Sequence, residues 1–146
     1  ISNVKEKNSV FIKNDRLDKI NNLPLERISK IRVEDKIDYI DSMVDVENVL
    51  ENSFGPSISN WENPEVIDLV IRTIPGMQKH FETMPLKFNT QQSNKDCVFT
   101  YKNTVVSNEL FYTLRQFGDA IEVIAPISIR ERFIEDIKRV YKKYPE

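Results

Sequence analysis

The chain has 146 residues, a net charge of −2, one cysteine, one histidine and three glycines. Its length allows one domain, or one small domain with a fragment of another, and its balanced charge excludes a chain-wide basic field for nucleic acid. The composition also excludes a disulfide framework, a multi-cysteine or histidine-rich zinc site and a glycine-rich phosphate loop. No apolar run is long enough to span a membrane. We expect a cytoplasmic protein with no cofactor, no bound metal and no membrane partner.

Residues 1–33 are predicted to be the last strands of a β domain whose earlier strands are absent. Residues 9–13 form one expected strand, and 14–22 form a polar connection that ends in an Asn-Asn turn signal. Residues 23–33 are the next apolar stretch. This is too little chain for a closed barrel. Because the chain begins with an isoleucine, we expect it to continue a longer protein.

Residues 34–51 are strongly acidic, with seven carboxylates and one lysine. The simplest interpretation is a solvated face; the alternative is attraction to the basic segment before it or to a partner. A helix is predicted over 35–55, where Asp45 can cap an apolar stripe. Gly55 is expected in the left-handed conformation that ends helices, and Pro56 prevents continuation.

Residues 57–64 are polar and end in a proline, which predicts a linker. This linker divides the chain into a first part, residues 1–56, and a second part, residues 65–146. Trp61 lies within the linker and is expected to anchor the two parts against each other.

The second part alternates strands and helices. Strands are predicted over residues 66–73, 86–90, 97–102 and 121–125, and helices over 75–84, 107–118 and 128–144. A polar hairpin loop is expected at 91–96, and Ser128 with Glu131 forms a capping box for the last helix. The apolar stripe of that helix consists of Ile129, Phe133, Ile137, Val140, Tyr141 and Tyr144. This order predicts an α+β fold with a ferredoxin-like β-α-β-β-α-β sheet and an added C-terminal helix.

Alternation along the strands sorts side chains onto two faces of the predicted sheet. Phe99 and Tyr101 fall on the face that the helices cover, so the open face lacks the base-stacking aromatics of RNA-recognition motifs. The open face mixes charges with Val70, Val98 and Ile124, which favours contact with a protein partner. We expect a homodimer, formed through this strip or through unpaired strands near the N-terminus.

Several short motifs occur in a characteristic order. They are Leu-Glu-Arg-Ile at 25–28, a helix ending in Ser-Phe-Gly at 44–55, the helix-Gly-strand-Pro stretch at 117–126, Ile-Arg-Glu at 129–131, and the closing tyrosines Tyr141 and Tyr144. The ordered set resembles the C-terminal half of bacterial WYL-domain transcriptional regulators, whose C-terminal extension has this ending. The resemblance covers nearly the whole chain after residue 23.

The resemblance implies a larger protein. Regulators of this family have a winged-helix DNA-binding domain, a WYL domain with an Sm-like β-barrel, and the extension. Here the winged helix and the Trp-Tyr-Leu tripeptide are absent, so residues 1–56 correspond to the terminal strands and helix of a WYL-type domain. The resemblance implies a regulatory, ligand-sensing and dimerising portion that reaches DNA through the absent domain and responds to a nucleotide, an oligonucleotide or another anionic effector.

By this resemblance, Arg27 and Arg130 are candidate ligand-binding residues, because a guanidinium can bind phosphate or carboxylate in a bidentate manner. The alternative for Arg27 is an ion pair with Glu26 or the acidic segment, and for Arg130 it is a surface ion pair. The alternative function is a free-standing ferredoxin-like module that binds a small molecule or nucleic acid. We expect no enzyme and assign no catalytic residue, because no nucleophile-base pair occurs and Cys97 is expected to be a small core residue.

Overall fold

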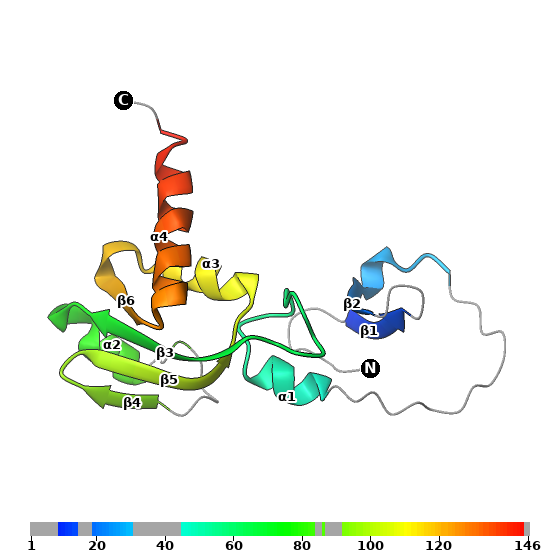
Figure 1. Ribbon diagram of the computed structural model, residues 1–146, viewed down its shortest axis with the longest axis horizontal. Coiled ribbons are helices and arrows are strands. Elements are labelled where there is room, and N and C mark those ends of the chain that lie inside the picture. The colour runs from blue at the N-terminus through cyan, green and yellow to red at the C-terminus, as the bar shows by residue number, and fades with distance from the viewer. Residues whose placement is uncertain (1–8, 15–18, 31–44, 84–85, 87–91, 145–146) are drawn as a thin grey trace.

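The computed structural model describes residues 9–14, 19–30, 45–83, 86 and 92–144 (Figure 1). Within these residues the fold is α+β, with a two-stranded and a four-stranded sheet. No helix in these ranges combines the length and apolar character needed to cross a bilayer.

The two-stranded sheet pairs β1, Ser9–Asn14, with β2, Lys19–Pro24, in antiparallel register. The first expected strand is confirmed. The polar connection expected through residue 22 is wrong, because backbone pairing with β1 makes a strand of a segment that has little apolar character. The chain then turns into a 3₁₀ helix, η1, Leu25–Arg27, which replaces the beginning of the apolar stretch expected over 23–33.

The helix α1 spans Val46–Glu51, and its cap is the expected one. The Oδ1 of Asp45 accepts a hydrogen bond from the backbone N–H of Asn48 at 3.0 Å. The helix ends near Asn52, whose carbonyl accepts a hydrogen bond from the N–H of Val105 at 2.7 Å. Pairing with the sheet therefore ends the helix before Gly55. The part of the predicted helix over residues 35–44 lies outside the described residues.

Gly55 has a different role from the one expected. It is not among the residues with positive φ, so it does not supply a left-handed helix end. A Cβ at this position would lie 2.5 Å from the side chain of Glu109. The carboxylate of Glu109 accepts a hydrogen bond from the N–H of Ser57 at 3.2 Å, so the glycine provides the space for a carboxylate that holds the following segment.

Residues 57–64 are packed against the rest of the structure. Ile58 and Trp61 are 8% and 6% exposed, and they form a small core with Val105, against which α1 packs through Val46, Val49 and Leu50. Trp61 is therefore a packing anchor, as expected. The division of the chain into domains at this segment stays a prediction.

The four-stranded antiparallel sheet has the order β4, Gln92–Lys95; β5, Val98–Val105; β3, Val66–Thr73; and β6, Ile121–Ala125. Between β3 and β4 the chain forms η2, Pro75–Met77, and α2, Gln78–Thr83. Between β5 and β6 it forms α3, Asn108–Gln116, and η3, Gly118–Ala120. The helix α4, Ile127–Tyr141, follows β6.

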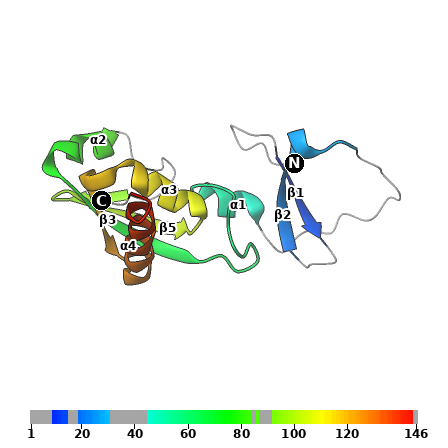
Figure 2. The same cartoon turned by 90° about the horizontal axis from the view of Figure 1, so that it is seen from above.

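One face of this sheet carries the main core. Phe99 and Tyr101 are 0% exposed, which confirms the predicted register of β5. The other members come from β3, β6, the three α-helices that follow β3, and the residue after β5: Leu69, Ile71, Phe81, Val106, Leu110, Leu114, Ile121, Val123, Ile129 and Phe133. The helices therefore cover one face and leave the other open, an arrangement that can be followed in Figure 2.

The connection between β4 and β5 is shorter than the expected hairpin loop. Asp96 and Cys97 have φ of 51° and 64°, as a two-residue hairpin turn requires, and the expected loop over 91–96 is a strand from residue 92. Polar residues form this strand because an edge position needs backbone pairing more than apolar side chains. Cys97 is half-buried in the turn, where its Sγ donates to Oε1 of Gln78 at 3.1 Å. Residues 87–90 of the expected strand lie outside the described residues.

The last helix begins at Ile127, one residue before the expected cap. The carbonyl of Pro126 accepts hydrogen bonds from the N–H groups of Ile129 and Arg130 at 3.1 and 3.0 Å, so the predicted capping box of Ser128 and Glu131 is wrong. The predicted apolar stripe is buried only at its start. Beyond that start the helix extends past the sheet (Figure 1), and the remaining stripe residues, Ile137, Val140, Tyr141 and Tyr144, are 38–73% exposed.

Candidate anion-binding site

The open face of the four-stranded sheet places charged residues of neighbouring strands side by side. Arg72 of β3 lies opposite Val98 of β5 and opposite Glu122 of β6. Arg72 and Glu122 are exposed, whereas their chain neighbours Ile71 and Val123 are buried. Strand alternation and strand pairing together therefore bring a guanidinium and a carboxylate to one place on this face.

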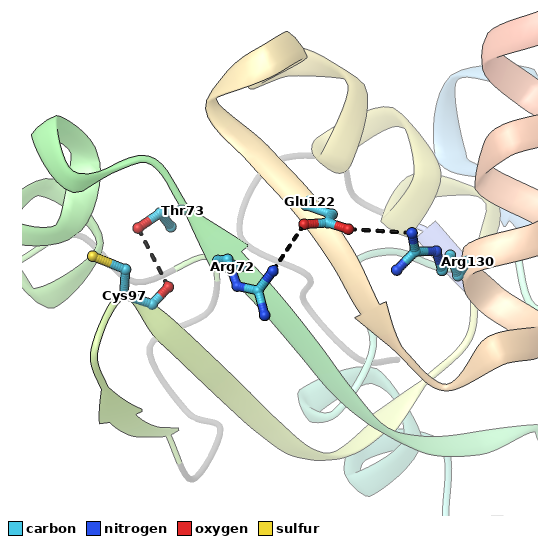
Figure 3. A network of polar contacts seen from close by, with 5 residues as sticks. All are labelled: Arg72, Thr73, Cys97, Glu122 and Arg130. Carbon is cyan, nitrogen blue, oxygen red and sulfur yellow. Dashed lines mark hydrogen bonds and ion pairs between the residues drawn. The ribbon is translucent and has the colours of Figure 1, made fainter.

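A second guanidinium completes the cluster (Figure 3). Nη1 of Arg72 lies 3.2 Å from Oε2 of Glu122, and Nη2 of Arg130 lies 3.2 Å from Oε1 of the same carboxylate. The side chains of Arg72, Glu122 and Arg130 are 55%, 47% and 43% exposed. One carboxylate thus holds two guanidiniums, which leaves the cluster with one excess positive charge.

The turn from β6 into α4 determines where Arg130 lies. The helix begins directly after Pro126, so Arg130 lies in its first turn. A cation is unfavourable there, because the partial charge at a helix N-terminus is positive. The carboxylate of Glu122 compensates for this. Ion pairs of such exposure contribute at most about 1 kcal/mol each, so a stronger anionic ligand can compete for both guanidiniums.

Donor groups remain available for such a ligand. A guanidinium carries five N–H donors, and each arginine of the cluster uses one terminal nitrogen to contact Glu122. A hollow of about 210 Å³ adjoins the cluster, lined by Arg72, Thr73, Ile74, Asp119, Ala120, Ile121 and Glu122. Since a liquid water molecule occupies about 30 Å³, the hollow has the volume for a small group. Its lining includes the carboxylates of Asp119 and Glu122 beside Arg72, so the positive charge that favours an anion comes from the two arginines of the cluster and not from the hollow.

Thr73 connects the hollow to the hairpin turn. Its N–H donates to the carbonyl of Cys97 at 2.9 Å, and its Oγ1 donates to the same carbonyl at 3.5 Å (Figure 3). These contacts hold the end of β3 against the β4–β5 turn. Arg72, the preceding residue, is therefore presented from a fixed backbone, which favours ligand binding over a mobile surface arginine.

A larger groove between α3 and α4, of about 660 Å³, is less suited to an anion. Two of its arginines already bind carboxylates: Arg132 contacts Glu65 at 2.8 Å, and Arg139 contacts Asp136 at 2.8 Å. Glu131 and Glu135 also line the groove. The lining of this groove has three carboxylates against two arginines, whereas the cluster of Arg72, Glu122 and Arg130 has an excess of one positive charge, so we take the open-face cluster as the candidate anion site.

The structure separates the two arginines predicted to bind ligand. Arg27 is exposed at the end of η1, so its expected position on a strand is wrong. No hydrogen bond or ion pair among the described residues joins it to Arg130, and the acidic segment that was its alternative partner falls mostly outside them. Arg130 forms an ion pair, as its alternative interpretation stated, and its partner is Glu122.

The three predicted interface residues are half-exposed and surround the cluster. Val70 and Val98 lie on the open face next to Arg72. Ile124 lies where the pairing of β3 with β6 shifts by one residue, because Val70 pairs with Ala125 and Ile71 with Val123. The interface assigned to these residues stays a prediction.

Strand alternation puts Arg72 and Glu122 among the charged residues of the open face, but the sequence did not assign them to the site. The signal was present, since both are open-face positions on strands that a β-α-β-β-α-β order makes neighbours. The residue pattern does not give the register of β3 with β6, which places these two residues opposite each other.

The assignment of the anion-binding site rests on the geometry described above. A scan against models of protein families finds no match, and a search of curated proteins finds none either. Within the described ranges, no group of three histidine, cysteine or carboxylate residues has the arrangement that holds a metal ion.

Proposed function

We propose that this chain is the regulatory, ligand-sensing and dimerising portion of a bacterial WYL-type transcriptional regulator, in which Arg72, Glu122 and Arg130 bind an anionic effector. The observation that carries the proposal is the pair of half-exposed guanidiniums, each 3.2 Å from one shared carboxylate. Guanidiniums that converge in this way match the oxygen geometry of a phosphate.

The fold assigned in this proposal is a ferredoxin-like sheet with an added C-terminal helix. It is supported by the strand order β4-β5-β3-β6, in which every pairing is antiparallel. The helices α2 and α3 occupy the two crossover connections, as this arrangement requires. The β1–β2 pair and α1 would then be the end of an Sm-like barrel domain.

The effector class follows from the chemistry of the cluster. Two guanidiniums favour a group that carries two or more oxygens and a negative charge, such as the phosphate of a nucleotide or a short oligonucleotide. Among the described residues, the apolar groups next to the cluster on the open face are valine and isoleucine side chains, which do not stack on bases. Phosphate contacts would therefore supply most of the affinity, and base identity would matter little.

The remaining parts of the proposal concern the whole regulator. The domain that reads DNA would lie outside this chain, and the regulator would act in the cytoplasm. The role proposed for the cluster is binding, because its two guanidiniums can orient a charged ligand through bidentate hydrogen bonds.

Isothermal titration calorimetry tests the site with three probes: inorganic phosphate, a mononucleotide and a short single-stranded oligonucleotide. We expect the double variant Arg72→Gln/Arg130→Gln to weaken oligonucleotide binding at least tenfold, because a charge-assisted hydrogen bond contributes roughly 1.5–3 kcal/mol. Arg139→Gln is the matched control, since Arg139 is an exposed arginine of the same helix that pairs with Asp136 instead. Equal affinity in the double variant and the wild type would refute the assignment.

A further inference from the structure

The helix α4 and the turn after it carry exposed apolar residues beside the face that packs into the core. Five of these residues are exposed, and together with the half-buried Arg130 they follow one another at intervals of three and four residues: Ile127, Arg130, Ile134, Ile137 and Tyr141 in the helix, and Tyr144 three residues after its end. This spacing is that of a coiled-coil seam. We call these six residues the α4 seam.

The exposure of the seam is high along its whole length. Ile127 is 70% exposed, Ile137 47% and Tyr144 73%. The residues that attach α4 to the sheet, Ile129 and Phe133, are 0% and 6% exposed and lie on a different side of the helix. The seam is thus separate from the surface that packs into the core, and the C-terminal part of α4 extends past the sheet (Figure 1).

We infer that the α4 seam binds the same seam of a second copy of this chain, with the two helices antiparallel. In this arrangement Ile134 packs against Ile137 of the partner subunit, and Ile127 packs against Tyr144 of the partner subunit. Arg130 faces Tyr141 of the partner subunit, which places a guanidinium over an aromatic ring. Each contact occurs twice, because a two-fold axis relates the helices.

Charge complementarity selects this orientation. Glu131 and Lys138 flank the seam on one side of the helix, and both are exposed. In the antiparallel pair each Glu131 lies beside the partner subunit's Lys138, which gives two symmetric ion pairs. A parallel pair would instead align the basic C-terminal ends of the two helices, which contain Lys138, Arg139, Lys142 and Lys143. Antiparallel helix dipoles favour the same choice.

The area of the seam is sufficient for a specific interface. If a fully exposed large side chain offers roughly 200 Å², the five apolar seam residues, at 40–73% exposure, leave roughly 600 Å² on each copy. Two copies would bury roughly 1,200 Å², the lower end of the range for specific protein interfaces.

This inference rests on the dimerisation part of the proposed function and replaces the expected contact surface with the α4 seam. It also brings the second copy next to the anion site, because Arg130 belongs both to the seam and to the Arg72–Glu122–Arg130 cluster. An effector that draws Arg130 away from Glu122 would move the guanidinium that faces the partner subunit's Tyr141.

Sedimentation equilibrium of the full chain across a concentration series tests the contact. We expect the mass to rise from 17.2 kDa toward twice that value, and Ile134→Asp/Ile137→Asp to weaken association at least tenfold. Tyr112→Asp is the matched control, because Tyr112 is 56% exposed on α3, outside the seam, and it should leave association unchanged. Circular dichroism verifies that each variant is folded.

A charge exchange tests the orientation. Glu131→Lys and Lys138→Glu should each weaken association, and the double variant should restore it, because the exchanged charges meet again only in the antiparallel pair. Failure of the double variant to restore association would overturn the orientation. A dimer that persists in the seam variants but is lost in Val70→Asp/Val98→Asp would overturn the seam while preserving dimerisation.

The titration with oligonucleotide, repeated on Ile134→Asp/Ile137→Asp, separates the two proposals. Oligonucleotide binding by a wild-type chain that stays at 17.2 kDa at every concentration overturns the seam and leaves ligand sensing intact. A seam-dependent dimer that binds none of the three probes supports the seam and removes the anion site.

Discussion

Alkaline pH should destabilise this fold through one buried tyrosine. Tyr101 is 0% exposed in the main core, and burial raises its pKa from 10.0 to about 12, partly offset by the backbone of Leu86. The phenolate is therefore more costly in the folded chain than in the unfolded chain. The contribution of Tyr101 to stability is complete below pH 10 and is lost as the pH rises through 10 toward 12.

The expected loss can be worked out from this difference in pKa. Each unit of pKa difference corresponds to about 1.4 kcal/mol. The free energy of unfolding should therefore fall by roughly 1 kcal/mol between pH 8 and pH 11, and by roughly 2 kcal/mol by pH 12. Urea unfolding followed by the fluorescence of Trp61, the single tryptophan, measures this free energy at each pH.

The variant Tyr101→Phe isolates the effect, because it keeps the ring and removes the ionisable hydroxyl. Other groups that titrate at high pH are present in both proteins, so the informative quantity is the difference between the two pH profiles. We expect the variant to lose roughly 1 kcal/mol less than the wild type between pH 8 and pH 11. Parallel profiles would show that Tyr101 ionises as readily in the folded chain as in the unfolded one, and would refute the reasoning.

Three further variants or assays test other parts of the structure. Gly118→Ala should lower the free energy of unfolding by about 1 kcal/mol, because Gly118 has a φ of +52°. Gly76→Ala, where an added Cβ meets nothing within 4 Å, should lower this free energy by less, and an equal decrease for both variants in urea unfolding would contradict the strain argument. Trp61→Ala should lower the free energy of unfolding by about 3 kcal/mol, measured by thermal unfolding with circular dichroism. Tyr112→Ala, at a 56% exposed position, should change this free energy by less than about 0.5 kcal/mol. Duplex DNA should bind weakly at physiological salt, since the net charge of −2 leaves little counterion release; tight, sequence-specific duplex binding in an anisotropy titration would show that this chain reads DNA itself.

Apolar alternation explains which strands the sequence could predict. Leu69 and Ile71 alternate with polar or exposed neighbours, and this pattern located β3 and its buried face correctly. The strands β2, Lys19–Pro24, and β4, Gln92–Lys95, lack such a pattern, because their main stabilisation is backbone pairing with a neighbour. Pairing is a tertiary property that residue periodicity does not encode.

Helix ends and the candidate site could not be predicted for the same reason, which is that they depend on tertiary contacts. Gly55 has the residue type of a helix end, yet its function is to leave space for Glu109, a residue 54 positions later. For Arg130 the sequence allows a surface ion pair, but its partner Glu122 follows only from the way α4 turns back on β6. In both cases the missing information was a contact between distant or differently folded segments.

The strand β5 connects the attachment point of α1 to the anion cluster. At one end of this strand, Val105 is held by Asn52 and packs with Trp61. At the other end, Val98 lies opposite Arg72 of the anion cluster. The strand Val98–Val105 joins these ends over roughly 24 Å. Its first four residues pair with both β3 and β4, whereas Thr104 and Val105 pair with β3 after a bulge in which Asn103 has a φ of 54°. Tension at α1 would therefore reach the residue opposite Arg72 through a strand that can bend at this bulge, so the contact at α1 and ligand occupancy at the cluster act on opposite ends of the same element.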